Sequence, residues 1–121
     1  MNTVLQEQHL LPGDPDAVGG RFECVLPGEV EPRLVAPGFR VFDLWAKDGR
    51  RAQLVKIAPG AIYPGRDLHE PGPEEVYVVA GTFDDGEREY PAGSFIHCPR
   101  GSWHRPGSAS GCVLFLFYPD G

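Results

Sequence analysis

The chain has 121 residues, of which 41% are hydrophobic, and its net charge is −6. This length predicts one domain that is large enough to bury a core of its own. The negative charge argues against nucleic acid and against an anionic membrane surface as partners, because both select basic patches. The 16 glycines and 13 prolines are spread between short apolar runs, which predicts frequent tight turns and an all-β fold.

The cysteines and the chain start indicate where the protein works. Cys24, Cys98 and Cys112 are an odd number and form no CxxC pair, so we expect free thiols rather than a disulfide framework. The first residues lack the basic and apolar regions of a signal peptide. The longest strongly apolar run, residues 112–118, is too short to cross a bilayer as a helix. We therefore predict a cytoplasmic protein, because free thiols persist in a reducing compartment.

The expected elements are short strands separated by turns. Residues 1–20 are predicted to form an N-terminal arm, with an amphipathic turn near residues 4–11, that packs on the domain formed by residues 21–121 or on a partner subunit. The Asp48-Gly49 pair predicts a hairpin between the second and third strands. The expected strands are residues 21–26, 39–45, 52–57, 61–63, 74–80, a segment beginning at Thr82, 87–90, 94–98, 103–105 and 112–118.

No segment has a sustained helical period, and residues 29–37, 67–73 and 106–111 are expected as irregular connections. Residues 112–118 are almost entirely apolar, which predicts a strand that is buried on both faces. Eight to ten short strands leave few free edges only when they close into a barrel or a jelly roll.

Two segments carry the residues that bind metals. Asp67 and His69 are two positions apart, so in extended backbone they project to the same side. Glu74 shares one face of the next expected strand with Val76 and Val78. His104 follows a Pro-x-Gly turn that aims it rigidly. Imidazole and carboxylate groups are the ligands of zinc, iron or manganese, so we predict one divalent metal ion held by Asp67, His69, Glu74 and His104.

Other readings of these residues remain open. Glu70 and Glu75 compete with Glu74 for the carboxylate role, and Asp67 is as compatible with a structural role as with a ligand. His97 is expected to be a structural side chain of the sheet face. Cys98 and Cys112 are expected to be buried apolar residues, and Tyr63, Phe95 and Trp103 are expected in the core or a pocket wall.

The same two segments resemble the paired motifs of the cupin superfamily. The second motif matches in full spacing from Gly93 to His104, with Ser108 in place of its final Asn. In the first motif an Asp stands at the position of the first His. The residues that carry this resemblance are Gly60, Asp67, His69, Glu74 and Gly81 in the first motif, and Gly93, Pro99, Gly101 and His104 in the second.

The amino-acid sequence of residues 74–83 and 90–95 is most similar to the cupin lobe of ChrR-type anti-sigma factors. The resemblance runs from about residue 38 to residue 118. It implies a small RmlC-like jelly-roll barrel with one metal ion inside. It also implies a small-molecule ligand or substrate and frequent pairing into homodimers. Three functions follow as hypotheses: a metal-dependent oxygenase- or isomerase-like enzyme, a non-catalytic sensing module, or a cupin without metal.

Overall fold

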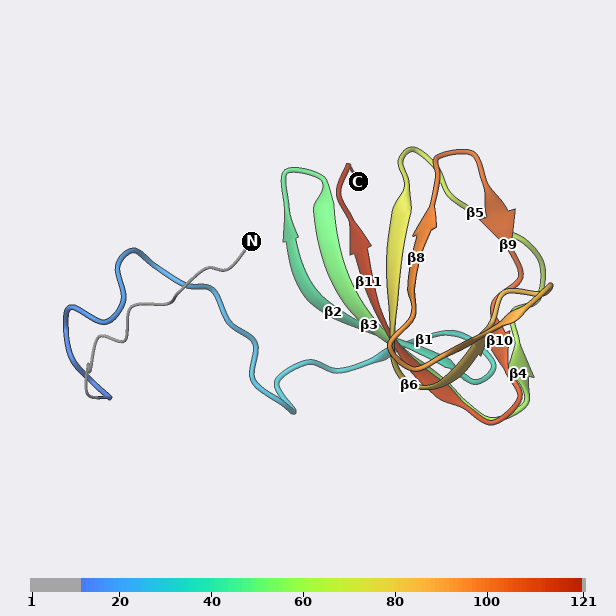
Figure 1. Ribbon diagram of the computed structural model, residues 1–121, viewed down its shortest axis with the longest axis horizontal. Helices are drawn as coiled ribbons and strands as arrows, with labels where there is room; N and C mark the ends of the chain where they lie inside the picture. Colours follow the sequence, from blue (N-terminus) through green and yellow to red (C-terminus); the bar gives the residue numbers. More distant parts are fainter. Residues whose placement is uncertain (1–11, 121) are drawn as a thin grey trace, which may run out of the picture.

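The computed structural model describes residues 12–120 of the chain. The predicted amphipathic turn at residues 4–11 lies outside these residues. Residues 12–32 contain no strand or helix and extend away from the barrel (Figure 1). The strand expected at residues 21–26 is therefore wrong: all six residues are exposed. A strand needs neighbours to accept and donate its backbone hydrogen bonds, and no strand of the described residues pairs with this segment.

The described residues form eleven strands and no helix, which confirms the all-β prediction. None of the described residues forms a helix able to span a membrane. The strands are β1 (Arg33–Ala36), β2 (Phe39–Lys47), β3 (Arg50–Ile57), β4 (Ala61–Ile62), β5 (Asp67–Leu68), β6 (Glu74–Asp84), β7 (Glu89–Pro91), β8 (Phe95–Cys98), β9 (Trp103–His104), β10 (Gly107–Ser108) and β11 (Cys112–Tyr118).

Nine strands make one curled sheet, in which β1-β2-β3-β11-β6-β10-β4 are neighbours and β7 and β8 pair with β6. All of these pairings are antiparallel. The sheet wraps around a core that includes Val55, Val76, Val78, Phe83 and Leu114. The expected hairpin at Asp48-Gly49 is confirmed, because both residues have positive φ angles and connect β2 directly to β3.

Strand β11 alternates rather than being buried on both faces. Cys112, Leu114 and Leu116 are buried inside, whereas Phe115 and Phe117 on the other face are only partly covered. The prediction of two buried faces was wrong because this antiparallel sheet has a single layer over much of its outer side, and an antiparallel strand can leave one face towards solvent.

Strand β6 is a single strand where the sequence suggested two. Its pairing with β11 shifts register between Ala80 and Val78, so Val79 is an extra residue in the ladder. Gly81 follows this bulge with a φ of 74°. A Cβ atom at Gly81 would lie 2.1 Å from the carbonyl oxygen of Gly111. The glycine therefore does not end the strand; it lets β6 bend and continue against β11.

Replacing Gly81 by alanine is expected to destabilise the fold by more than about 2 kcal/mol, because left-handed strain adds to a backbone clash. Gly93→Ala is the matched control. Gly93 also has a positive φ of 92° but nothing within 4 Å of its Cβ position, so it should lose only about 1–2 kcal/mol. Urea unfolding of both variants measures the difference. Equal losses would show that the approach of Gly111 does not constrain β6.

A second, two-stranded sheet pairs β5 with β9 and joins the two motif segments. Asp67 is the direct partner of His104, and Leu68 is the partner of Trp103. Residues 67–68 were expected in a loop. Their pairing with residues 103–104 could not be predicted from the local sequence pattern, because the partners are far apart in the chain. Trp103 is 54% exposed beneath Arg66, whose guanidinium lies 4.1 Å from the ring centroid. Trp103 is therefore not a core residue, and neither is Phe95, which is 65% exposed.

Candidate metal centre

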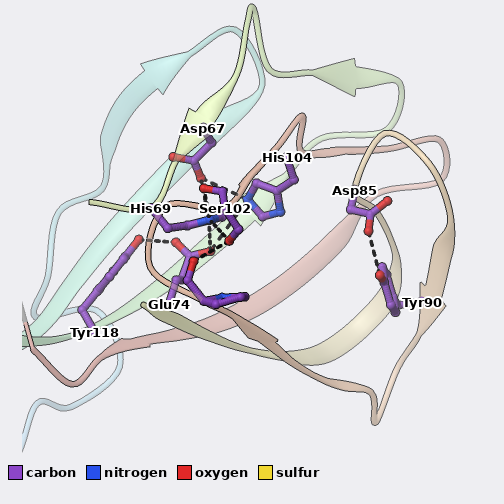
Figure 2. A network of polar contacts seen from close by, with 9 residues as sticks. Asp67, His69, Glu74, Asp85, Tyr90, Ser102, His104 and Tyr118 are labelled. Atoms are coloured by element: carbon purple, nitrogen blue, oxygen red, sulfur yellow. Dashed lines mark hydrogen bonds and ion pairs between the residues drawn. The ribbon is translucent and has the colours of Figure 1, made fainter. Parts of the chain in front are cut away.

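The four predicted ligands meet at one point inside the barrel (Figure 2). One donor atom from each of Asp67, His69, Glu74 and His104 lies within 4.8 Å of all the others. His69 and Glu74 are 4% and 2% exposed, whereas Asp67 and His104 are partly exposed. The site thus has a buried half and a half that opens towards the cavity.

Ser102 determines which nitrogen of His69 faces the site. Its hydroxyl donates to the carbonyl oxygen of Pro99 at 2.5 Å, so its Oγ can only accept. His69 Nδ1 lies 3.0 Å from this Oγ and 2.9 Å from the carbonyl oxygen of the same serine. Both neighbours are acceptors, so Nδ1 carries the hydrogen and, in the neutral ring, Nε2 presents a lone pair.

His69 Nε2 is buried and makes no hydrogen bond among the described residues. Its nearest charged neighbour is Glu74 Oε1 at 3.3 Å. A ring lone pair and a carboxylate lone pair face each other at this distance, and burying two acceptors together is unfavourable unless a cation lies between them. Either a proton or a metal ion meets this need.

The pKa of His69 reflects this environment. Burial lowers the pKa of His69, but the adjacent Glu74 carboxylate, then the charge of Asp67 and the carbonyl of Ser102, raise it. The raising effects prevail, so the pKa of His69 lies above its ordinary value. The two carboxylates raise this pKa because a proton on Nε2 would partly neutralise them.

Tyr118 orients the buried carboxylate. Its hydroxyl donates to Glu74 Oε2 at 2.6 Å, which leaves Oε1 directed at His69. Burial, followed by the charge of Glu74, raises the pKa of Tyr118, so this donor keeps its proton. The Arg51 guanidinium lies 4.2 Å from the tyrosine ring centroid and packs against it. Oε2 of Glu74 therefore accepts a hydrogen bond from the protein, and Oε1 is available to bind a metal ion.

His104 and Asp67 complete the constellation from the β5–β9 sheet. His104 Nε2 lies 3.1 Å from Asp67 Oδ2 and 3.8 Å from Glu74 Oε1. The His104 ring contacts the His69 ring edge-on, with centroids 4.6 Å apart, and also packs against Phe83. These contacts hold both imidazoles with their Nε2 atoms towards the carboxylates.

These distances fit a metal ion. Ligand atoms bound at about 2.0–2.2 Å from one ion are separated by about 3.0–3.5 Å. Two of the four separations between nitrogen and oxygen atoms, 3.1 and 3.3 Å, lie in this range, and the other two, 3.8 and 3.9 Å, lie slightly above it. The donor set, two imidazoles and two carboxylates, is one that zinc, iron and manganese accept.

The rival carboxylates lie elsewhere. Glu75 is on the outer face, where its Oε2 lies 2.7 Å from Nδ1 of His97. His97 is thus a sheet-face residue, as expected. Glu70 pairs with Arg100 at 3.3 Å on the surface. Alternation along β6 separates Glu74 from Glu75, as the sequence predicted.

Sequence reasoning missed Ser102 and Tyr118. Both had a usable signal: Ser102 lies inside the Pro99-x-Gly101-x-x-His104 spacing, and Tyr118 shares the inward face of its strand with Leu114 and Leu116. What the sequence did not contain was the partner of each, because the contacts link residues 33 and 44 positions apart.

A cavity of about 220 Å³ opens onto the site. Asp67, Glu74, His104 and Tyr118 line its polar end. The remaining wall is largely apolar and includes Val41, Val55, Ile57, Tyr63, Val76, Phe83, Leu114 and Leu116. Its volume is below the range of about 300–1,000 Å³ typical of drug-sized ligands, so it suits a small organic molecule.

Comparison with known proteins places the chain in a family. A profile described as the ChrR Cupin-like domain matches residues 28–119. The chain belongs to this family of cupins, and the resemblance seen in its motifs is confirmed. Among curated proteins, the search found no significant match.

Three solved structures illustrate the likeness. KdgF from Halomonas sp. is 25% identical with a TM-score of 0.69, over 80% of this chain and 94% of that one. An RmlC-like cupin from Shewanella frigidimarina is 20% identical with a TM-score of 0.71, over 81% and 90%. The structure of Rhodobacter sphaeroides SigE in complex with the anti-sigma ChrR matches at 23% identity and a TM-score of 0.65. That match covers 77% of this chain and about half, 51%, of the other.

Glu74→Gln is expected to weaken binding of a divalent metal at least about tenfold, because an amide removes one negative ligand and disturbs the contact with Tyr118. Glu75→Gln is the matched control one residue away, on the outer face, and should bind metal as the natural protein does. Calorimetric titration with Mn²⁺ measures both. The reverse ranking would mean that β6 faces inward through Glu75, a register shifted by one residue.

Proposed function

We propose that this cupin binds one divalent metal ion through Asp67, His69, Glu74 and His104. The protein would be a metal-dependent enzyme that acts on a small organic molecule in an oxygenase- or isomerase-like reaction. The observation that carries the proposal is the buried His69 Nε2, a lone pair without a hydrogen bond that faces a buried carboxylate oxygen at 3.3 Å. An ion between them converts an unfavourable contact into two bonds.

A bound ion of this kind supplies a Lewis acid, or a place where a substrate and dioxygen meet, provided that it keeps open coordination positions. The protein's own groups set the surroundings. His69 and Glu74 are held by Ser102 and Tyr118, so the buried half of the site is rigid. Asp67, which is partly exposed and borders the cavity, is the ligand that an entering substrate reaches most easily.

The apolar cavity supports a small ligand with an apolar body and one polar group. The polar group would point towards Glu74, His104 and Tyr118, and the body would fill the space between Val55 and Leu116. Water exclusion by these aliphatic walls strengthens each electrostatic interaction at the polar end.

Metal analysis of protein purified without a metal-affinity tag tests the site. We expect about one equivalent of zinc, iron or manganese per chain. Oxygen uptake and product analysis on a panel of small molecules then test catalysis. A protein that takes up no divalent metal would refute the site, and a loaded protein that turns over none of the panel would favour the second function below.

The second function is a non-catalytic module that senses a ligand or stress through the same metal site. The family match favours this second function, since the description of the family names ChrR. The solved structure that contains ChrR is a complex with SigE. The match to that structure shows the fold alone, so a sigma factor as partner of this chain is part of this second proposal only.

We also propose that the protein is a homodimer in a reducing compartment such as the cytoplasm. All three cysteines are free. One row of large apolar residues crosses the outer face of the sheet in register, each opposite the next: Phe42, Leu54, Phe115, Tyr77 and Phe95. Arg40 and Lys56 lie on one side of this outer row, and Glu75 on the other. Such a face is self-complementary, as a two-fold interface requires.

Light scattering at tens of micromolar is expected to give twice the chain mass of 13.2 kDa. Phe95→Glu, at the exposed end of the outer row, should give a monomer because it places a charge in an apolar contact. Ile62→Glu is the control, because Ile62 is equally exposed but lies on β4, the end strand that pairs with β10 and contributes no residue to the outer row. A natural protein that is monomeric at this concentration would exclude the dimer.

A further inference from the structure

Cys98 borders the same constellation and has no part in the function proposed above. It is the direct partner of Glu74 across β6 and β8, and both side chains point inward. Its sulfur lies within 4.8 Å of ligand nitrogens of both His69 and His104. The two imidazoles therefore belong to two overlapping donor groups, one completed by carboxylates and one completed by a thiol.

We propose that Cys98 is a ligand for thiophilic metals, so that the site binds Cd²⁺ or Zn²⁺ through His69, Cys98 and His104. Hard ions such as Mn²⁺ use the carboxylates instead. The proposal rests on the metal site proposed above and adds a selection rule to it: soft metals recruit the thiolate, and hard metals recruit Asp67 and Glu74.

The second observation behind this proposal is the unpartnered Nε2 of His69, which is buried and directed into the site. A thiolate bound at about 2.3 Å and an imidazole bound at about 2.0 Å put sulfur and nitrogen about 3.5 Å apart. The observed limit of 4.8 Å means that sulfur and nitrogen need to approach by at most about 1.3 Å, which rotation of a short side chain can supply.

Without metal the thiol is protonated and inert. Burial, and then the charges of Glu74 and Asp67, raise the pKa of Cys98 to about 12. On binding, the sulfur–metal bond replaces the sulfur–hydrogen bond and one proton passes to solvent. The two carboxylates that suppress ionisation of the free thiol then balance the charge of the bound cation.

Titration of the metal-free protein with Cd²⁺ tests the proposal through thiolate-to-metal charge-transfer absorption, which needs no enzyme assay. We expect a band that saturates at one equivalent. Cys98→Ser should lose the band, and its preference for Cd²⁺ over Mn²⁺ should fall at least about tenfold. Cys112→Ser is the control: Cys112 is also buried but starts β11, at the opposite end of that strand from Tyr118. This variant should retain both properties.

The outcomes separate the two proposals. If Mn²⁺ and Cd²⁺ both bind but Cd²⁺ gives no band, the metal site stands and Cys98 is not a ligand. A band that persists in Cys98→Ser would also exclude Cys98. If neither ion binds, the metal site itself is refuted, and this inference fails with it.

Discussion

Replacing His104 or His69 by alanine is expected to reduce metal affinity more than about 100-fold, beyond the usual effect of losing an outer partner. Packing and hydrogen bonds direct both imidazoles at the carboxylates. A water molecule does not fully replace either imidazole as a metal ligand. Nε2 of His69 is also buried and has no hydrogen-bond partner in the described part of the chain. Elemental analysis after dialysis and calorimetric titration measure the loss.

Asp67→Ala should cost less, about tenfold, because Asp67 is partly exposed and water can take its place. His97→Ala is the control for removing an imidazole, since His97 lies on the outer face beside Glu75. Circular dichroism of each variant verifies that the β-fold is intact. Equal metal content in His104→Ala and in the natural protein would remove the basis for the site.

The second large effect is a metal-induced rise in melting temperature that depends on pH. An ion at 100 times its dissociation constant stabilises the folded state by about 2.7 kcal/mol. For a domain of this size that corresponds to a shift of about 10 °C. We expect this shift at pH 7.5 with added Zn²⁺ or Mn²⁺, measured by calorimetry or by circular dichroism.

Towards pH 5.5 the shift should shrink. The pKa of His69 is raised in the metal-free fold. Its protonated ring therefore stabilises that fold fully below the unfolded pKa of about 6.5, and this contribution is lost as the pH rises through the folded pKa. The proton that stabilises the metal-free protein also occupies Nε2, so metal must displace it. Lowering the pH thus stabilises the metal-free fold and, at the same time, weakens its affinity for the metal ion.

Even a histidine with an ordinary pKa is only about one-tenth neutral at pH 5.5, which lowers affinity about tenfold for each imidazole required. His97→Ala should retain the full pH dependence, since His97 is outside the site. A shift of the same size at pH 7.5 and pH 5.5 would show that binding does not involve histidine.

Local patterns in the sequence predicted much of this protein. The spacing of turns indicated an all-β fold, and Asp48-Gly49 indicated the hairpin between β2 and β3. The alternation along residues 74–78 put Glu74 inside and Glu75 outside, and the Pro99-x-Gly101 turn placed His104. These features depend on the backbone within a few residues, where period, turn chemistry and side-chain direction are physically linked.

Other features depended on partners far away in the chain. Residues 21–26 have a strand-like composition but no neighbouring strand, and Gly81 continues β6 because Gly111 lies against it. Tyr118 and Ser102 orient Glu74 and His69 across the barrel, and the short β5–β9 pairing sets Asp67 against His104. Only the tertiary structure decided these contacts, because a carboxylate or a ring nitrogen acquires its partner from whatever the closed sheet brings beside it.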